Sequence, residues 1–337
     1  MEDQKTVTVA FYDAKPYDIE FFTNLNKEYL YTIEFLETNL NSKTALLAEG
    51  ADVVCAFVND KIDKKTILTL EKMGIKLIAM RCAGFNNVDL ETAYGKIPVV
   101  RVPAYSPHSI AEYSAALLFS LTRKIPLAFN RTRDGNFQLN GLTGRNLHGR
   151  TCGIVGTGKI GKLMAQIMKS CGMKVIAYDA YADKDWASEV GVEYTNKETL
   201  FIQSDVVSLH CPLTTETRHI INDRSLAMMK KDAVIINTGR GALIDSKALI
   251  EALKDKKIGG AALDVYEEED EYFYEDWSTT VIQDDVLARL LFMPNVIVSS
   301  HQAFLTEEAL TAIARTTFEN IKAFAENLPL ENEVKRS

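Results

Sequence analysis

The 337-residue sequence lacks several features that would assign it to a specialised class of protein. It has no apolar run of 18 residues that could span a membrane, and its first residues, Met-Glu-Asp-Gln-Lys, lack the apolar core of a secretory signal. It has no internal repeat and no low-complexity segment. Lysine and arginine number 38 against 46 aspartates and glutamates, and the net charge of −8 argues against a general nucleic-acid or anionic-membrane surface. We expect a soluble, cytoplasmic protein.

Cysteine is also scarce. The five cysteines are scattered, odd in number and form no C-x-x-C pair or Cys/His cluster at metal spacing: Cys55, Cys82, Cys152, Cys171 and Cys211. Four of them lie in or beside apolar strand-like runs. We therefore expect reduced thiols in a reducing compartment, and neither a disulfide framework nor a metal site.

The chain has two series of alternating strand-like and helix-like segments, which is typical of parallel α/β sheets. The first series has strands near 7–12, 31–35, 52–58, 75–80 and 97–102, with helical runs near 18–29, 42–49 and 64–73. A helical pattern at 109–123 and a polar excursion follow. The second series has strands near 151–155, 175–179, 205–210, 233–237, 260–264 and 295–299. Six strands match the Rossmann count.

An amphipathic helix at 306–326 closes the sequence and is placed to return to the first domain. The expected fold is therefore α/β, with two Rossmann-like or flavodoxin-like parallel-sheet domains separated by a hinged cleft. We assign residues 1–102 and 304–337 to a discontinuous substrate (catalytic) domain. Residues 103–303 would form the second domain, of the Rossmann type that binds dinucleotides, and this domain would include an interface arm at about 121–148.

The second series opens with a glycine-rich stretch, Thr151-Cys-Gly-Ile-Val-Gly156-Thr-Gly158-Lys-Ile-Gly161, which fits G-x-G-x-x-G between a strand and a helix. Gly156 would allow the tight turn, Gly158 the approach of a pyrophosphate, and Gly161 close packing of helix on strand. Asp179 ends the next strand 18 residues later and could bind a ribose diol, with no nearby arginine for a 2′-phosphate. This favours NAD over NADP, although a structural glycine turn and a turn-starting aspartate are alternatives.

Three side chains follow successive strands of the second series: Arg240, Glu269 and His301. Histidine can give and take a proton near neutral pH, and a carboxylate partner would fix its tautomer. Arginine presents a planar fork that can hold a carboxylate and polarise a carbonyl. Together with a dinucleotide site, these groups suit hydride transfer to a 2-oxo acid. Each also has a structural alternative: a solvated arginine, one glutamate in a run of three, and a structural histidine.

Seven stretches carry a more specific pattern: Arg81–Asp89, Val102–Pro107, Gly156–Gly161, His210–Pro212, Asn237–Asp245, Leu263–Glu267 and Ser300–Phe304. Through them the chain resembles the D-2-hydroxyacid dehydrogenase family, within it the NAD-dependent fermentative D-lactate dehydrogenases, and the resemblance covers nearly the full length. The resemblance implies that Arg240 binds and polarises the substrate, that His301 is the acid/base and that Glu269 is its partner. Only the family's spacing of five residues after Asp264 selects Glu269 over Glu267 and Glu268.

The resemblance also implies that the backbone amides of Ala83 and Gly84 hold the substrate carboxylate, and that Tyr105 and Phe304 border the pocket. Tyr105 could instead pack at the hinge and Phe304 in the core. The implied cofactor contacts are Gly156, Thr157, Gly158, Lys159, Ile160, Asp179, His210, Cys211, Pro212, Thr238 and Asp264.

The expected function is reversible reduction of pyruvate to D-lactate with NADH, in a homodimer or an assembly built from dimers. No metal is expected. One alternative is a larger branched-chain or aryl 2-oxo acid as substrate. A remote alternative from another class is an NAD-responsive corepressor-like binding protein, but the sequence has no long low-complexity tail or basic patch for recruiting partners.

Overall fold

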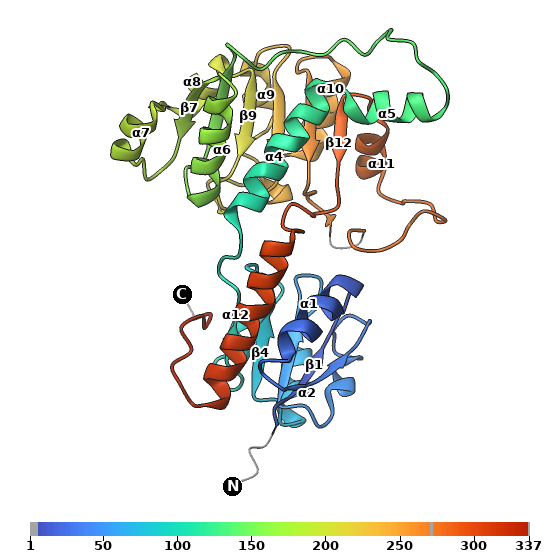
Figure 1. Cartoon of the computed structure of the whole chain (residues 1–337), viewed down its shortest axis with the longest axis vertical. Coiled ribbons are helices and arrows are strands. Elements are labelled where there is room, and N and C mark those ends of the chain that lie inside the picture. The colour runs from blue at the N-terminus through green and yellow to red at the C-terminus, as the bar shows by residue number, and fades with distance from the viewer. Residues whose placement is uncertain (1–5, 270–271, 336–337) are drawn as a thin grey trace. The chain divides into compact units, whose positions relative to one another are not determined.

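The computed structural model describes residues 6–269 and 272–335, and the chain divides into two compact units (Figure 1). Unit 1 comprises Met1–Ser106 and Leu305–Ser337, and unit 2 comprises Pro107–Phe304. Residues 103–106 therefore belong with unit 1, and Phe304 belongs with unit 2.

Unit 1 is built on a five-stranded sheet in the order β2-β1-β3-β4-β5, in which every strand pair is parallel. This is the flavodoxin-like order. The strands are β1 Thr8–Phe11, β2 Thr32–Phe35, β3 Val53–Ala56, β4 Leu77–Met80 and β5 Val99–Val100. Strands β3 and β4 are buried throughout, which is the hydrophobic pattern of strands covered on both faces.

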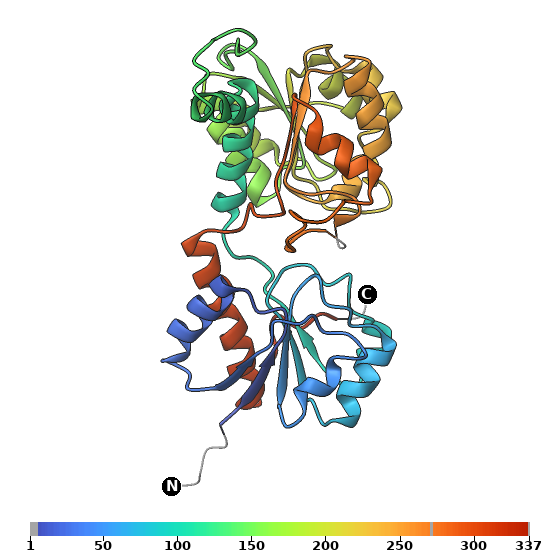
Figure 2. The ribbon, with the colours of Figure 1, turned by 90° about the vertical axis from the view of Figure 1, so that its right-hand side faces the viewer.

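The helices of unit 1 are α1 Pro16–Asn26, α2 Lys64–Lys72, α3 Leu90–Ala93 and α12 Glu307–Ala325, with a 3-10 turn at Ala45–Ala48. Helix α12 comes from the end of the chain and packs beside α1 (Figure 2), where the rings of Phe22 and Phe318 meet at 5.3 Å. Thr306 caps α12 by accepting a hydrogen bond from the Ala309 N–H. Helix α12 is thus grouped with unit 1, although it follows unit 2 in the sequence.

Unit 2 is built on a seven-stranded parallel sheet in the order β12-β11-β10-β9-β6-β7-β8. The strands are β6 Thr151–Val155, β7 Lys174–Tyr178, β8 Glu193–Tyr194, β9 Val206–Leu209, β10 Val234–Asn237, β11 Gly260–Leu263 and β12 Val296–Val298. The order reverses between β6 and β9, which is the switch point where ligands bind in such sheets. The predicted α/β fold with parallel sheets is confirmed, and the short edge strand β8 is an addition that the sequence did not predict.

Helices cover both faces of this sheet. They are α4 Pro107–Thr122, α6 Lys159–Ser170, α7 Lys184–Val190, α8 Lys197–Gln203, α9 Asp223–Met228, α10 Ser246–Lys254 and α11 Asp285–Phe292, with a 3-10 turn at Gly241–Leu243. Successive side chains of a strand point to opposite faces of the sheet. Ile154 belongs to the same hydrophobic core as Leu118 and Met164, and Val155 belongs to the other core with Leu249. Aspartates cap several of these helices, as Asp284 does for α11.

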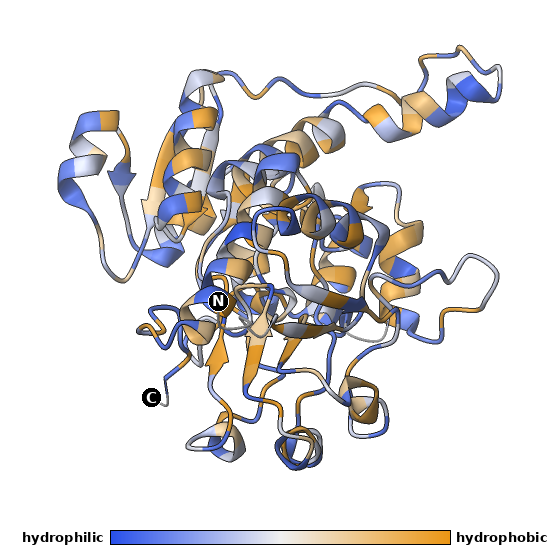
Figure 3. Cartoon of the chain, turned by 60° about the horizontal axis from the view of Figure 1, so that its bottom comes forward, coloured by the Kyte–Doolittle hydropathy of each residue, from blue (hydrophilic) through white to orange (hydrophobic). Residues whose placement is uncertain are grey.

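A polar arm follows α4. It contains α5 Ile125–Arg133, which the sequence did not predict as a helix, and extends away from the body of unit 2 (Figures 1 and 3). Several of its apolar side chains are exposed, including Ile125, Phe129, Phe137 and Leu139. Its return to the body is fixed by Arg145, which forms an ion pair with Asp232 at 2.8 Å.

Candidate active site

The glycine-rich turn joins β6 to α6 at the switch point. Gly156 has φ +93°, a conformation that favours glycine, and a Cβ there would collide with the backbone of His210 and Cys211. A Cβ at Gly161 would overlap the Gly156 carbonyl oxygen, so the helix packs tightly on the turn. A Cβ at Gly158 would meet only open space. Gly158 and Lys159 are exposed at the start of α6, which leaves the helix N-terminus accessible to a phosphate group.

Asp179 follows β7 and faces this turn. Its Oδ2 accepts hydrogen bonds from the Thr157 N–H at 2.5 Å and the Thr157 hydroxyl at 3.0 Å, and its Oδ1 accepts one from the Tyr181 N–H. The Thr157 hydroxyl lies 2.7 Å from the hydroxyl of Tyr194. A carboxylate has about four acceptor positions, so Asp179 keeps capacity for a ribose hydroxyl. Its negative charge repels a 2′-phosphate, and the site fits NAD.

The loop after β9 packs against the other side of the glycine turn. His210 donates its N–H to the Val155 carbonyl at 2.7 Å, and its Nε2 lies 2.8 Å from the Ser208 hydroxyl. Burial lowers the pKa of His210 to about 4, so the ring is neutral at physiological pH. Burial raises the pKa of Cys211 to about 11, and Pro212 beside it is exposed. These residues form an uncharged surface beside the glycine-rich turn.

The loop after β10 carries Arg240. Buried Asn237 holds this loop, because its Oδ1 accepts a bond from the Gly239 N–H and its Nδ2 donates to the Arg240 carbonyl. Gly241 packs so closely on Tyr266 that a Cβ would overlap the Tyr266 carbonyl group. Arg240 is partly exposed, and its Nη1 donates to the Gly239 carbonyl at 2.7 Å.

Thr238 lies in the same loop and is buried. Its hydroxyl meets that of Ser114 on α4 at 2.8 Å, which ties the loop to the helix behind the sheet. Thr238 therefore has a structural contact besides its proposed place at the cofactor.

Asp264 follows β11 and is fully buried. Its Oδ1 accepts bonds from the Ser299 hydroxyl at 2.7 Å and the Gln302 N–H at 3.0 Å, and its Oδ2 accepts one from the Ala303 N–H at 2.8 Å. Burial raises the pKa of Asp264, while these donors oppose the shift. The carboxylate thus fixes residues 299–303, the loop that carries His301.

His301 and Glu269 meet within unit 2. His301 Nδ1 lies 2.7 Å from Glu269 Oε1, and each side chain is 19% exposed, so solvent screens the pair only partly. Glu269 Oε2 also accepts a bond from the Tyr266 N–H at 2.8 Å. A carboxylate on Nδ1 fixes the ring orientation and leaves Nε2 as the nitrogen for proton exchange.

His301 has an unusual backbone conformation. Its φ is +51°, in the left-handed region that β-carbon-bearing residues seldom occupy. The residue is held there by its own N–H, which donates to the Asp264 carbonyl at 2.7 Å, and by the Tyr274 hydroxyl, which donates to the His301 carbonyl at 3.0 Å. Backbone strain maintained by surrounding bonds is typical of functional positions.

The neighbouring Glu267 contacts different side chains. Its Oε1 accepts bonds from Arg218 Nη2 at 2.9 Å and lies 2.7 Å from His219 Nε2. Glu269 is therefore the glutamate that reaches His301, while Glu267 ties the same loop to the segment after β9. The residues themselves do not separate these roles, because both depend on how the loop turns, and only the family spacing after Asp264 selected Glu269.

The remaining proposed substrate residues lie on different units. Ala83 and Gly84, in the loop after β4, and Tyr105 belong to unit 1, and all three are partly exposed. Phe304 belongs to unit 2 and is buried. Asn237 was not predicted to hold the Arg240 loop, because this role depends on a loop geometry that a strand-end position does not reveal.

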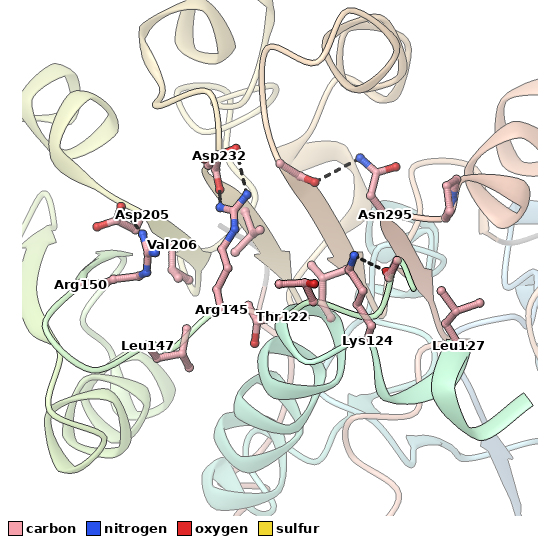
Figure 4. Close-up of a pocket in the computed structure, with 16 residues that line it drawn as sticks. Thr122, Lys124, Leu127, Arg145, Leu147, Arg150, Asp205, Val206, Asp232 and Asn295 are labelled. Carbon is pink, nitrogen blue, oxygen red and sulfur yellow. Dashed lines mark hydrogen bonds and ion pairs between the residues drawn. The ribbon is translucent and has the colours of Figure 1, made fainter. Parts of the chain in front are cut away.

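A cavity of about 340 Å³ lies in unit 2, beside the amino-terminal ends of the strands (Figure 4). Arg150, Asp205 and Asn295, each just before a strand, line it together with the arm residues Gly141 and Arg145. It is thus at the opposite edge of the sheet from the glycine turn and His301. In the described part of the chain, no cluster of three or more histidine, cysteine or acidic side chains could hold a metal ion.

Residues 115–303 match the family model described as "D-isomer specific 2-hydroxyacid dehydrogenase, NAD binding domain". The chain is 50% identical to the 2-hydroxyacid dehydrogenase homolog 1 of Schizosaccharomyces pombe, over 94% of this chain and 96% of that protein. It is 48% identical to the D-lactate dehydrogenase of Escherichia coli, over 97% and 99% of the two chains. The solved structure of the pyruvate reductase of Chlamydomonas reinhardtii superposes with a TM-score of 0.93 at 42% identity, over 97% and 98% of the two chains.

Proposed function

Because the chain belongs to the D-isomer specific 2-hydroxyacid dehydrogenase family and uses NAD as its cofactor, we propose that it reversibly reduces pyruvate to D-lactate. The names of the bacterial and algal relatives support this substrate. The observation in the chain itself that carries the proposal is the 2.7 Å pairing of His301 with Glu269 at the carboxyl edge of an NAD-binding sheet.

The cofactor would be held at the switch point of unit 2. The backbone from Thr157 to Ile160 at the N-terminus of α6 would receive the pyrophosphate, and Asp179 would accept hydrogen bonds from the adenosine ribose. His210, Cys211 and Pro212 would border the adenosine, and Thr238 and Asp264 would lie toward the nicotinamide. When bound, NADH supplies the hydride that reduces the keto carbon.

The protein groups would hold the substrate and compensate the charge that develops on it. The Arg240 guanidinium would polarise the keto oxygen and bind the substrate carboxylate, which the amides of Ala83 and Gly84 would also hold. Tyr105 and Phe304 would border the methyl side of the pocket. Protonated His301 would deliver its Nε2 proton to the oxygen of the substrate, while Glu269 stabilises the imidazolium through Nδ1.

The substitution His301→Gln tests this mechanism, and His219→Gln is a matched control, because both histidines pair with a glutamate at 2.7 Å. We expect His301→Gln to lower kcat for pyruvate by at least about 100-fold, since general acid catalysis contributes roughly 10²- to 10⁴-fold. His219→Gln should stay within about fivefold of the unmodified enzyme. Turnover of pyruvate by His301→Gln at the unmodified rate would refute the assignment.

Substrate choice within the family is tested by following NADH absorbance with pyruvate, 2-oxoisocaproate and phenylpyruvate. Pyruvate should give the highest kcat/KM. A preference for either larger acid would replace pyruvate with a branched-chain or aryl substrate and leave the acid/base assignment in place. A chiral assay of the product should find D-lactate.

The arm would form the contact surface of a homodimer or of a tetramer built from dimers. Phe137 and Leu139 are 76% and 80% exposed, and Ile125 and Phe129 of α5 are also largely exposed. Exposed apolar clusters of this kind mark protein interfaces. Light scattering should show at least a dimer, and the double substitution Phe137→Lys with Leu139→Lys should shift it toward monomer. A monomeric unmodified protein would contradict this part of the proposal.

A cytoplasmic location is also part of the proposal. Cys55, Cys82 and Cys152 are buried reduced thiols, and Cys171 and Cys211 are reduced and partly exposed, which suits a reducing compartment. None of the described helices combines the length and hydropathy that a membrane span needs. Fractionation of cells should recover the protein with cytosolic markers.

A further inference from the structure

We propose that Arg101 is a positioning residue for substrate binding: it orients and polarises the peptide group whose N–H would hold the substrate carboxylate. This inference rests on the proposed function, because it assumes that the amides of Ala83 and Gly84 receive that carboxylate. All of the contacts that support it lie within unit 1.

The central contact is a hydrogen bond to the peptide between Ala83 and Gly84. Arg101 Nη1 donates to the Ala83 carbonyl oxygen at 2.8 Å. In a planar trans peptide this oxygen and the Gly84 N–H lie on opposite sides of the peptide bond and point in opposite directions. Fixing the carbonyl toward Arg101 therefore directs the Gly84 N–H away from it. Within the described residues, no acceptor is present for the N–H of Ala83 or Gly84.

The next peptide is fixed in the same manner by a different donor. The Cys82 thiol lies 3.3 Å from the Gly84 carbonyl oxygen and donates to it. The Cys82 carbonyl in turn accepts a bond from the Val102 N–H at 3.1 Å, which ties the loop to the segment after β5. The carbonyls of residues 82, 83 and 84 are thus all engaged by protein donors, and successive amides remain for an anion.

Arg101 contributes charge as well as geometry. A cationic donor on the Ala83 carbonyl polarises that peptide, and hydrogen bonds arranged in series strengthen one another by about 10–30% each. The guanidinium also lies over the ring of Phe85, with its central carbon 4.9 Å from the ring centroid. Stacking on this ring restricts the side chain to the orientation that reaches Ala83.

The backbone of Arg101 is held by the last part of the chain. Its N–H donates to the Asn332 carbonyl at 3.1 Å, and its carbonyl accepts a bond from Asn320 Nδ2 at 3.0 Å. Asn332 Nδ2 donates to Asn320 Oδ1, and Val100 forms an antiparallel bridge with Glu333. The segment after α12 thereby supports the arginine that orients the loop.

The test compares Arg101→Gln and Arg101→Lys with Arg315→Gln, a control that removes a partly exposed arginine paired with Glu28 in the same unit. The measurements are KM and kcat for pyruvate, the Kd of oxamate, a pyruvate isostere, in the presence of NADH, the Kd of NADH, and Tm. Arg101→Gln should raise KM and the oxamate Kd by about 10- to 100-fold, as expected for loss of a charge-assisted hydrogen bond. NADH binding and Tm should match those of the control, with kcat lowered by less than about fivefold.

Arg101→Lys should recover most of the lost oxamate affinity, because it keeps a cationic donor near the carbonyl. The inference is overturned if Arg101→Gln leaves KM and the oxamate Kd unchanged, or if it weakens NADH binding equally or lowers Tm well below that of the control. Those results leave the proposed function in place as long as the unmodified enzyme reduces pyruvate. Failure of the unmodified enzyme to reduce any 2-oxo acid would refute the proposed function and this inference together.

Discussion

Replacing Glu269 by glutamine isolates the contribution of one carboxylate to the acid/base group. Glu269 accepts two hydrogen bonds in the structure, from His301 Nδ1 at 2.7 Å and from the Tyr266 N–H at 2.8 Å. Glutamine has a single carbonyl oxygen, and its NH₂ group is a donor. In Glu269→Gln one of the two donors must therefore face another donor, and the negative charge beside the imidazolium is lost.

The magnitude follows from the kind of bond that is lost. Hydrogen bonds to charged groups contribute about 1.5–3 kcal/mol, and the partial burial of both side chains, each 19% exposed, limits compensation by water. If this energy is lost where the imidazolium is needed in the transition state, kcat falls by roughly 10- to 150-fold. KM for pyruvate should change by less than about threefold, because Glu269 would contact the histidine and not the substrate.

The assay is steady-state oxidation of NADH at saturating pyruvate, with Glu267→Gln as the control. Glu267 pairs with Arg218 and His219 and makes no contact with His301. Glu267→Gln should therefore reduce kcat by less than about fivefold. A larger loss in Glu267→Gln than in Glu269→Gln, or an unchanged kcat in Glu269→Gln, would show that the wrong glutamate has been assigned.

Substitutions at three positions, His301, Asp179 and His210, give separate outcomes. His301→Gly should be more stable than His301→Ala by about 1 kcal/mol in thermal unfolding, the reverse of the usual order, because φ is +51° at this position; an alanine variant of equal or higher stability would contradict this. Asp179→Asn should raise kcat/KM with NADPH relative to NADH by about tenfold or more, since the charge that repels a 2′-phosphate is removed; an unchanged ratio would argue against Asp179 at the ribose. Burial lowers the pKa of His210 to about 4 in the folded protein. Between about pH 6.5 and 4 the unfolded chain therefore binds a proton that the folded chain does not, and the free energy of unfolding decreases as the pH falls through this window. His210→Gln should remove at most about 2 kcal/mol of the destabilisation seen between pH 7 and pH 5, and parallel pH–stability curves for the two proteins would refute this.

The sequence predicted the fold well because its strongest signals are local in the sequence. Buried parallel strands such as β3 and β4 read as continuous apolar runs, and the glycine turn fixes where β6 ends and α6 begins. Helix α5 and strand β8 were not predicted, for different reasons. The arm around α5 has few buried side chains to give a periodic pattern, and β8 is a two-residue edge strand that depends on pairing with β7.

The candidate site was predictable as a set of residues that follow strands. The hydrogen-bond partners and backbone conformations of these residues were not. Positions after adjacent parallel strands must share one edge, which is enough to group Arg240, Glu269 and His301. The residues alone do not distinguish Glu267 from Glu269, because the choice depends on the path of the loop after β11, and the sequence analysis made it only through the family spacing after Asp264. The left-handed conformation of His301 also has no local sequence signal, because it is maintained by bonds to Asp264 and Tyr274.

The structure separates residues that would react from residues that place them. Asn237 and Asp264, both fully buried at the ends of adjacent strands, use their side chains to hold the loops that carry Arg240 and His301. A buried amide or carboxylate with every bond directed at one loop admits few alternative conformations, because each alternative would leave a buried polar atom unpaired. This constraint explains how His301 can keep a strained backbone while its ring stays aligned with Glu269. Arg101 has the equivalent place in unit 1, where a side chain bound to a carbonyl fixes the direction of the amide beyond it.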